Sequence, residues 1–158
     1  MMRERQENIQ ASILDRLIDD EPEVSTELPH SQGVSMRQVE KSLLRDLENL
    51  LNTRRNILDP PAAYGELNRS LYTYGLRDYT AENPNNPMVL QNLRREIAQS
   101  VALFEPRLKN VVVQIDTGRE RRELFFRIAG TMVVESFAEP VAFDIQLDPN
   151  RGEYFISR

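Results

Sequence analysis

The carboxylates of the C-terminal half are the side chains whose type and spacing could do chemistry. Glycoside hydrolysis needs two of them flanking one bond. The candidates are Glu105, Asp116, Glu123, Glu135, Asp144 and Asp148. Asp144 and Asp148 fall on the polar positions of an alternating strand pattern, which predicts exposed carboxylates of ordinary acidity. The sequence therefore favours solvated carboxylates over a catalytic pair.

Other catalytic and metal-binding patterns find no support in the sequence. The chain has no cysteine, its one histidine is His30, and its six glycines are scattered. These features argue against a thiolate or histidine metal site, a serine nucleophile elbow and a phosphate-binding loop. We predict that the protein is not an enzyme and needs no cofactor.

The length and composition of the chain indicate the broad class of protein. The chain has 158 residues, enough for one domain with its own core, and no run approaches the roughly 18 apolar residues of a membrane span. We therefore predict no direct membrane insertion. The lack of cysteine is consistent with a cytoplasmic protein.

The net charge of −5 lies entirely in the N-terminal arm, residues 1–33, because the remaining residues carry equal numbers of acidic and basic side chains. An acidic balance without a basic block argues against nucleic-acid binding. The bias of the basic residues to arginine leans weakly towards protein partners, and a simple compositional preference explains it about as well.

The arm contains a short amphipathic segment. Ile13, Leu14, Leu17 and Ile18 stand at helical spacing before Pro22. Isolated helices of this length are marginal in water, so the segment must find a surface, either on its own domain or on a partner. A stretch rich in turn-forming residues follows, and we predict an arm and linker over residues 1–33 and a folded domain over residues 34–158.

Three helices are expected in the first half of the domain. Val39, Leu43, Leu47 and Leu50 recur with a period near 3.6 and predict a helix from about residue 35 to 54. The stretch GELNRSLYTYGLRD, residues 65–78, predicts a short helix that ends at Gly75. A third helix is expected to begin after Asn86 and to end before Pro106.

The period changes to two after Pro106. Alternating apolar residues predict strands around residues 111–116, 124–134 and 141–147, with Gly130 marking a bulge. The stretch EYFIS predicts a short final strand near a sheet edge. Helices followed by hairpin-connected strands indicate an α+β fold, in which an N-terminal arm precedes three helices packed on a small antiparallel C-terminal sheet.

Glu105-Pro106-Arg107 places two opposite charges around a proline where the third helix meets the first strand. A helix-to-strand turn would more simply use glycine or asparagine. Pro106 fixes the backbone between the charges, and Arg107 suits a bidentate bond to a carboxylate. The motif is either a local salt bridge or a docking point that presents both charges outward, and we favour the docking point.

The chain also resembles a known family. Four stretches carry the likeness: SILDRLIDDEP, LLRDLENLLNTRRN, LYTYGLRDYT and REIAQSVALFEPRLKNVVV. They resemble TssE, the sheath-initiator subunit of the type VI secretion baseplate, which is related to the GPW-like baseplate-wedge proteins of contractile-tailed phages. The chain has Arg77 where members often have proline, which loosens expectations for that loop.

The resemblance implies a structural part that joins the baseplate wedge to the sheath, in a baseplate docked at the inner-membrane complex. It assigns Glu105, Pro106 and Arg107 to contacts with the core bundle of TssF and TssG in a TssK-containing wedge. The sheet is expected to accept strands of the TssB–TssC sheath by β-augmentation. The strand-exchange candidates are Val141, Phe143, Ile145, Tyr154, Phe155 and Ile156.

Three further predictions remain open. We expect Ile13, Leu14, Leu17 and Ile18 to fasten the arm to another wedge subunit. One alternative function is a regulatory binding module of the same fold, such as an anti-adaptor that controls proteolysis of a sigma factor. The other is a lysozyme-like cell-wall hydrolase.

Overall fold

The computed structural model describes Leu17 and residues 36–83, 86–117, 124–135, 137–148 and 151–157. The chain divides into two units, Met1–Leu43 and Leu44–Arg158, and helix α2 crosses the boundary between them. The residues that build the candidate site, Asp46, Glu105, Pro106 and Arg107, all belong to the second unit. The predicted division at residue 33 into arm and domain stays a prediction.

Helix α2, Met36–Asn52, follows the leucine periodicity of the sequence. Leu47, Leu50 and Leu51 are buried in the second unit, as expected for the apolar stripe of an amphipathic helix. The helix ends with the backbone N–H of Thr53 donating to the carbonyl of Asn49 at 3.0 Å. Charged residues of α2 outside this stripe, such as Asp46, can therefore contact other elements.

The short helix predicted over residues 65–78 is wrong. The stretch forms two 3-10 turns, η1 (Leu67–Arg69) and η2 (Leu71–Thr73), so the described residues from 36 onward contain two α-helices rather than three. Ser70 separates the turns: its backbone is extended, and its hydroxyl donates to the carbonyl of Leu67 and accepts from the N–H of Tyr72. Such local serine bonds compete with the helical ladder.

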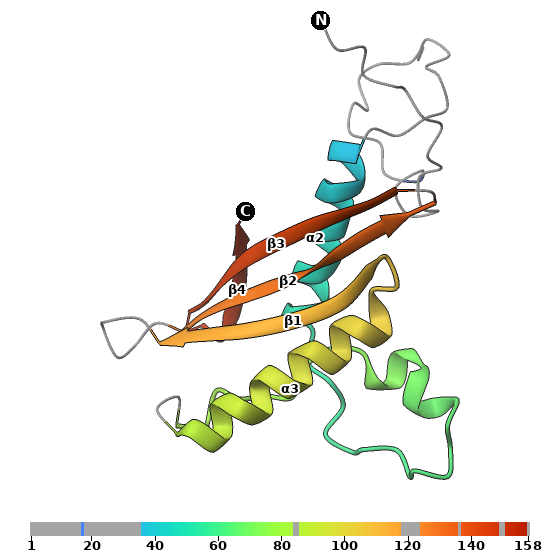
Figure 1. Ribbon diagram of the computed structural model, residues 1–158. Helices are drawn as coiled ribbons and strands as arrows, with labels where there is room; N and C mark the ends of the chain where they lie inside the picture. Colours follow the sequence, from blue (N-terminus) through green and yellow to red (C-terminus); the bar gives the residue numbers. More distant parts are fainter. Residues whose placement is uncertain are drawn as a thin grey trace, which may run out of the picture. The chain divides into compact units, whose positions relative to one another are not determined.

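Helix α3, Pro87–Phe104, begins and ends as the sequence predicts. The Asn86 side chain accepts from the N–H of Met88 at 3.0 Å, and Pro87 occupies the first turn. Leu93, Ile97 and Val101 are buried on one face. Figure 1 shows α3 lying along strand β1, and contacts between the two elements form one side of the core.

Four strands form one antiparallel sheet in the order β1-β2-β3-β4. They are β1 (Leu108–Thr117), β2 (Leu124–Val134), β3 (Phe137–Asp148) and β4 (Glu153–Ser157). The α+β fold with an antiparallel C-terminal sheet is therefore confirmed, and β4 lies at a sheet edge as predicted.

The predicted bulge at Gly130 lies instead on the facing strand. Strand β2 runs through Gly130 without interruption, whereas the register of β1 shifts between Lys109 and Val112, where Asn110 has a φ of 55°. A Cβ added to Gly130 would lie 2.8 Å from the Lys109 carbonyl oxygen. The glycine thus permits close approach of a bulged neighbour.

Candidate interaction site

The joint between α3 and β1 is a tight turn built around Pro106. The N–H of Glu105 still donates to the carbonyl of Val101 at 2.9 Å, so Glu105 closes the helix. The carbonyl of Glu105 then accepts from the N–H of Leu108 at 3.1 Å, and β1 begins at that residue. Pro106 stops the helical ladder at this point, because it has no N–H and restricts the residue before it.

Glu105 and Arg107 form a bidentate ion pair within this turn. Arg107 Nε donates to Glu105 Oε1 at 2.7 Å, and Arg107 Nη2 donates to Oε2 at 2.6 Å. The backbone N–H of Arg107 also donates to Oε1 at 3.1 Å. The carboxylate therefore receives three bonds from one residue, which fixes the angle of the guanidinium.

Asp46 of helix α2 completes the cluster. Its Oδ2 accepts from Arg107 Nη2 at 2.6 Å, and its Oδ1 accepts from Arg45 at 3.0 Å. Asp46 and Arg107 are 61 positions apart, so the contact joins α2 to the α3–β1 turn. The hydrogen bonds to Glu105 raise the pKa of Arg107, burial opposes the rise, and the nearby Asp46 charge adds to it. Arg107 is therefore firmly cationic.

The prediction that both charges of the motif point outward is wrong for Glu105. Glu105 is only 4% exposed, because its side chain turns inward to meet Arg107. The Arg107 side chain is 24% exposed, and Pro106 is exposed. The local salt bridge considered as the alternative is therefore present, and a partner can reach only the proline ring and part of the guanidinium. Partner binding by these residues stays a prediction.

Tyr74 packs beside the cluster. Its ring meets that of Phe104 edge to face, with centroids 5.1 Å apart. Burial raises the pKa of Tyr74, and the negative charges of Asp46 and Glu105 raise it further. Tyr74 belongs to the segment between α2 and α3, so this segment contacts the same α3–β1 joint as the Glu105–Arg107 pair.

A second buried carboxylate, Glu96 of α3, holds the segment between α2 and α3 in place. Its Oε1 accepts from the backbone N–H of Arg77 at 2.8 Å, and its Oε2 accepts from the Tyr79 hydroxyl at 2.6 Å. Burial and the bond to Glu96 both raise the pKa of Tyr79. The N–H of Arg77 is a donor that a proline at this position would lack.

The strand-exchange candidates divide into core and edge positions. Four of them, Val141, Phe143, Ile145 and Tyr154, are buried, whereas Phe155 is 46% exposed. Ile156 is half-buried and pairs with Ile145. Among the described residues, β4 pairs with β3 only from Asp144 to Asp148, so the earlier part of β3 extends beyond β4.

The arm candidates Ile13, Leu14 and Ile18 lie outside the described residues. Leu17 is described, and its side chain is 76% exposed. None of the helices in the described part of the chain has the length and apolarity that a membrane crossing requires. In that same part, no three His, Cys, Asp or Glu side chains gather as a metal ion would need.

Sequence reasoning missed Asp46 and Glu96, the two acids that tie distant segments together. Both stand on predicted helices, beside or within an apolar stripe: Asp46 precedes Leu47, and Glu96 precedes Ile97. An acid at the border of a buried helix face is the one signal that could have marked them, since such a group needs a partner.

Comparisons with known proteins point to one family. The family model described as "Baseplate wedge protein gp25" matches residues 37–136. Among solved structures, a chain from "The baseplate complex from the type VI secretion system" is similar, with a TM-score of 0.52 and 24% identity over 70% of this chain and 93% of that chain. At this identity the structural likeness shows the fold. A comparison with curated proteins found no match.

Proposed function

The chain belongs to the gp25 family of baseplate wedge proteins, and on this premise we propose that it joins the wedge core of a type VI secretion baseplate to the first sheath ring. Family membership makes it a structural baseplate protein. The observation that carries the proposal is the family match, which spans α2, α3, β1 and all of β2 and includes Glu105-Pro106-Arg107. The likeness to a chain of a type VI baseplate complex and the TssE-like stretches favour the secretion branch.

The proposed wedge contact uses the α3–β1 turn. Glu105 and Asp46 hold the Arg107 guanidinium at a fixed angle, and the exposed Pro106 ring lies beside it in the chain. A partner helix of the TssF–TssG core bundle then meets a prepared surface, since the arginine needs no reordering on binding. Glu105 acts as the residue that positions Arg107, while Pro106 and Arg107 make the contact.

The proposed sheath contact uses the outer edge beside β4. Strand β3 extends beyond the residues that pair with β4, and β4 itself is a sheet edge. A strand from the TssB–TssC sheath can add to this edge through main-chain hydrogen bonds. Buried Val141, Phe143 and Ile145 hold the edge in place by packing into the core, while Phe155 is exposed on the edge strand.

The proposed role of the arm is to fasten the protein to another wedge subunit. Leu17 is 76% exposed, which supports a side chain that seeks a partner surface. Leu14→Ser/Leu17→Ser is expected to weaken wedge association without lowering the melting temperature of the domain. Unchanged co-purification of this variant would refute the docking role.

The proposed role requires no catalysis and places the protein in the cytoplasm, in a baseplate docked at the inner-membrane complex. Glu105 is engaged by Arg107 through both carboxylate oxygens, which does not suit a general acid. Turnover of peptidoglycan by the wild-type protein that is lost in Glu105→Gln would overturn the non-enzymatic role.

Co-purification of the full chain with TssF and TssG tests the proposal. Pro106→Gln alters the exposed part of the turn and leaves the ion pair in place, so we expect at least about tenfold weaker binding at a nearly unchanged melting temperature. Pro140→Gln, at an exposed proline of β3, is the matched control and should bind as wild type does. Failure of the wild-type protein to bind would refute the function, and full binding by Pro106→Gln would refute only the site.

A further inference from the structure

Tyr74 brings a hydroxyl group to the candidate interaction site. Its ring packs edge to face on Phe104, the last residue of α3, with the two centroids 5.1 Å apart. The negative charges of Asp46 and Glu105 raise the pKa of Tyr74, so its hydroxyl lies within electrostatic reach of both carboxylates. These are the two carboxylates that bond Arg107, and Tyr74 therefore lies next to the charged cluster.

The Tyr74 hydroxyl is available to a partner. It makes no hydrogen bond within the part of the chain that the structure describes. In that same part, the buried side-chain atoms without a partner are Glu40 Oε1 and Arg55 Nε, so the unbonded Tyr74 hydroxyl must reach solvent. Tyr74 as a whole is half-buried. A tyrosine with a packed ring and a solvated hydroxyl is suited to a protein interface.

The backbone on the C-terminal side of Tyr74 is bonded to both neighbouring helices. The N–H of Leu76 donates to the carbonyl of Thr53, just after the end of α2, at 2.9 Å. The hydroxyl of Ser100 in α3 donates to the carbonyl of Gly75 at 3.3 Å. The position of Tyr74 is therefore fixed relative to the end of α2 and to α3.

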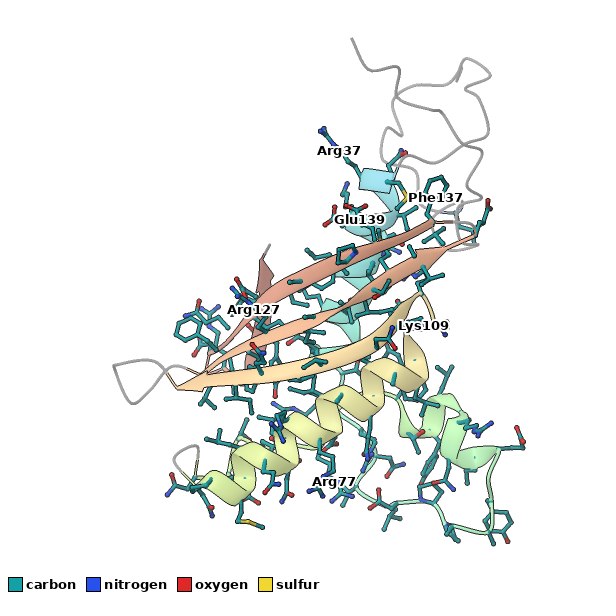
Figure 2. All side chains as sticks on the ribbon, in the orientation of Figure 1. Arg37, Arg77, Lys109, Arg127, Phe137 and Glu139 are labelled. Carbon is teal, nitrogen blue, oxygen red and sulfur yellow. The ribbon has the colours of Figure 1, made fainter. Side chains whose placement is uncertain are left out.

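Glu96 extends this support to the residues that follow. Its Oε1 accepts from the N–H of Arg77 at 2.8 Å, and Figure 2 shows Arg77 on the side of α3 away from the sheet. Its Oε2 accepts from the Tyr79 hydroxyl at 2.6 Å. Tyr74 is thus held in position before a partner arrives, which lowers the ordering cost of a contact through its hydroxyl.

The charges next to Tyr74 balance. Ion pairs of 3.0 Å or less link two cations and two anions: Arg45, Arg107, Asp46 and Glu105. Burial and the two carboxylates raise the pKa of Tyr74 above 10.0, so its phenol stays neutral at physiological pH and keeps a proton to donate. The same two carboxylates would repel a carboxylate of a partner. An uncharged carbonyl oxygen is therefore the acceptor that suits this hydroxyl best.

We propose that Tyr74 is a further contact residue of the α3–β1 joint, and that its hydroxyl donates a hydrogen bond to an uncharged carbonyl oxygen of the wedge partner. The inference rests on the proposed wedge contact and adds to it a residue outside the Glu105-Pro106-Arg107 motif. Tyrosine and arginine are among the residue types that most often dominate the energy of an interface. The contact then extends from the turn to the segment between α2 and α3.

The affinity of the full chain for the purified TssF–TssG complex, measured at several salt concentrations, tests the proposal. Tyr74→Phe keeps the ring that packs on Phe104 and removes only the hydroxyl, so binding should weaken at least about fivefold at an unchanged melting temperature. The dependence of the affinity on salt should stay as in wild type, because no ion pair is removed. Tyr64→Phe is the matched control: Tyr64 lies in the same segment, is 60% exposed, and should tolerate the loss of its hydroxyl without a change in affinity.

The results distinguish this inference from the proposed function. Failure of the wild-type protein to bind the TssF–TssG complex would refute the function, and the inference with it. Where wild type binds, equal affinity of Tyr74→Phe, or an equal loss in Tyr64→Phe, would refute the Tyr74 contact alone. A loss in Tyr74→Phe with a shallower salt dependence would also overturn it, because Tyr74 would then act by positioning the charges of Arg107 and not through its own hydrogen bond.

Discussion

Arg107→Ala tests whether the charged cluster holds the α3–β1 turn together. The substitution removes a cation that meets both oxygens of Glu105 and also bonds Asp46 at 2.6 Å. Glu105, which is only 4% exposed, would lose its compensating cation. The cost therefore arises chiefly from the stranded carboxylate rather than from the lost contact.

The expected loss of unfolding free energy depends on how deeply the ion pair is buried. Removing one partner of a fully buried ion pair costs about 3–5 kcal/mol of unfolding free energy. The Arg107 side chain is 24% exposed and that of Asp46 is 27% exposed, so water partly screens the cluster and about 2–4 kcal/mol is a better range. For a domain of this size that loss lowers the melting temperature by roughly 5–15 °C.

Thermal and urea unfolding of four proteins measures the effect: wild type, Arg107→Ala, Glu105→Gln and the double variant. Because the double variant leaves no stranded charge at Glu105, its loss should be smaller than the sum of the single losses by about 2 kcal/mol. Arg127→Ala is the matched control. It breaks the exposed Arg127–Asp144 pair on the sheet and should not change the melting temperature measurably.

Two results would refute the reasoning. One is an Arg107→Ala protein that melts within about 1 °C of wild type, since a stranded buried carboxylate must cost more. The other is strict additivity of the two single substitutions, which would mean that Glu105 and Arg107 act independently.

Three further predictions concern the rest of the second unit. Burial raises the pKa of Tyr154 to about 12 from 10.0, so the neutral phenol favours the folded state, and unfolding free energy should fall as pH rises from about 10 to 12. In urea titrations at each pH, Tyr154→Phe should show a shallower fall than wild type, and the remainder belongs to Tyr74 and Tyr79, whose pKa values are raised as well. Gly75→Ala should cost roughly 2–4 kcal/mol in the same assay, because φ is +99° and the new Cβ would lie 2.2 Å from the Thr53 carbonyl oxygen, whereas Gly65→Ala meets nothing within 4 Å and should be nearly neutral. Asn52→Ala removes a bond to the Tyr154 carbonyl at 2.9 Å and one from its N–H at 2.8 Å, so amide hydrogen exchange in β4 should accelerate while that in β2 stays unchanged.

Local patterns were sufficient for most of the fold. The leucine repeat of α2, the Asn86-Pro87 start of α3 and the alternation of β2 and β3 each reflect interactions within a few residues, so the sequence alone predicts them. The helix expected at residues 65–78 failed for a reason that is also local. The Ser70 side chain bonds to its own backbone neighbours and divides the stretch into two turns.

The bulge opposite Gly130 was harder to assign. A glycine within a strand signals close approach of another backbone, but the sequence does not tell which strand carries the extra residue. The register of β1 against β2 decides this, and it places the irregularity between Lys109 and Val112. Strand pairing is a long-range property, and the pattern of a single strand does not contain it.

The sequence by itself determined that Glu105, Pro106 and Arg107 stand at a helix-to-strand joint, because the change of period and the proline are local facts. Only the tertiary structure decided that Glu105 turns inward and that Asp46, 61 positions away, shares the guanidinium. The physical reason is that a charge buried at a joint must find its counter-charge in space. The packing of α2 against the joint supplies that counter-charge, and nothing in the local sequence specifies the packing.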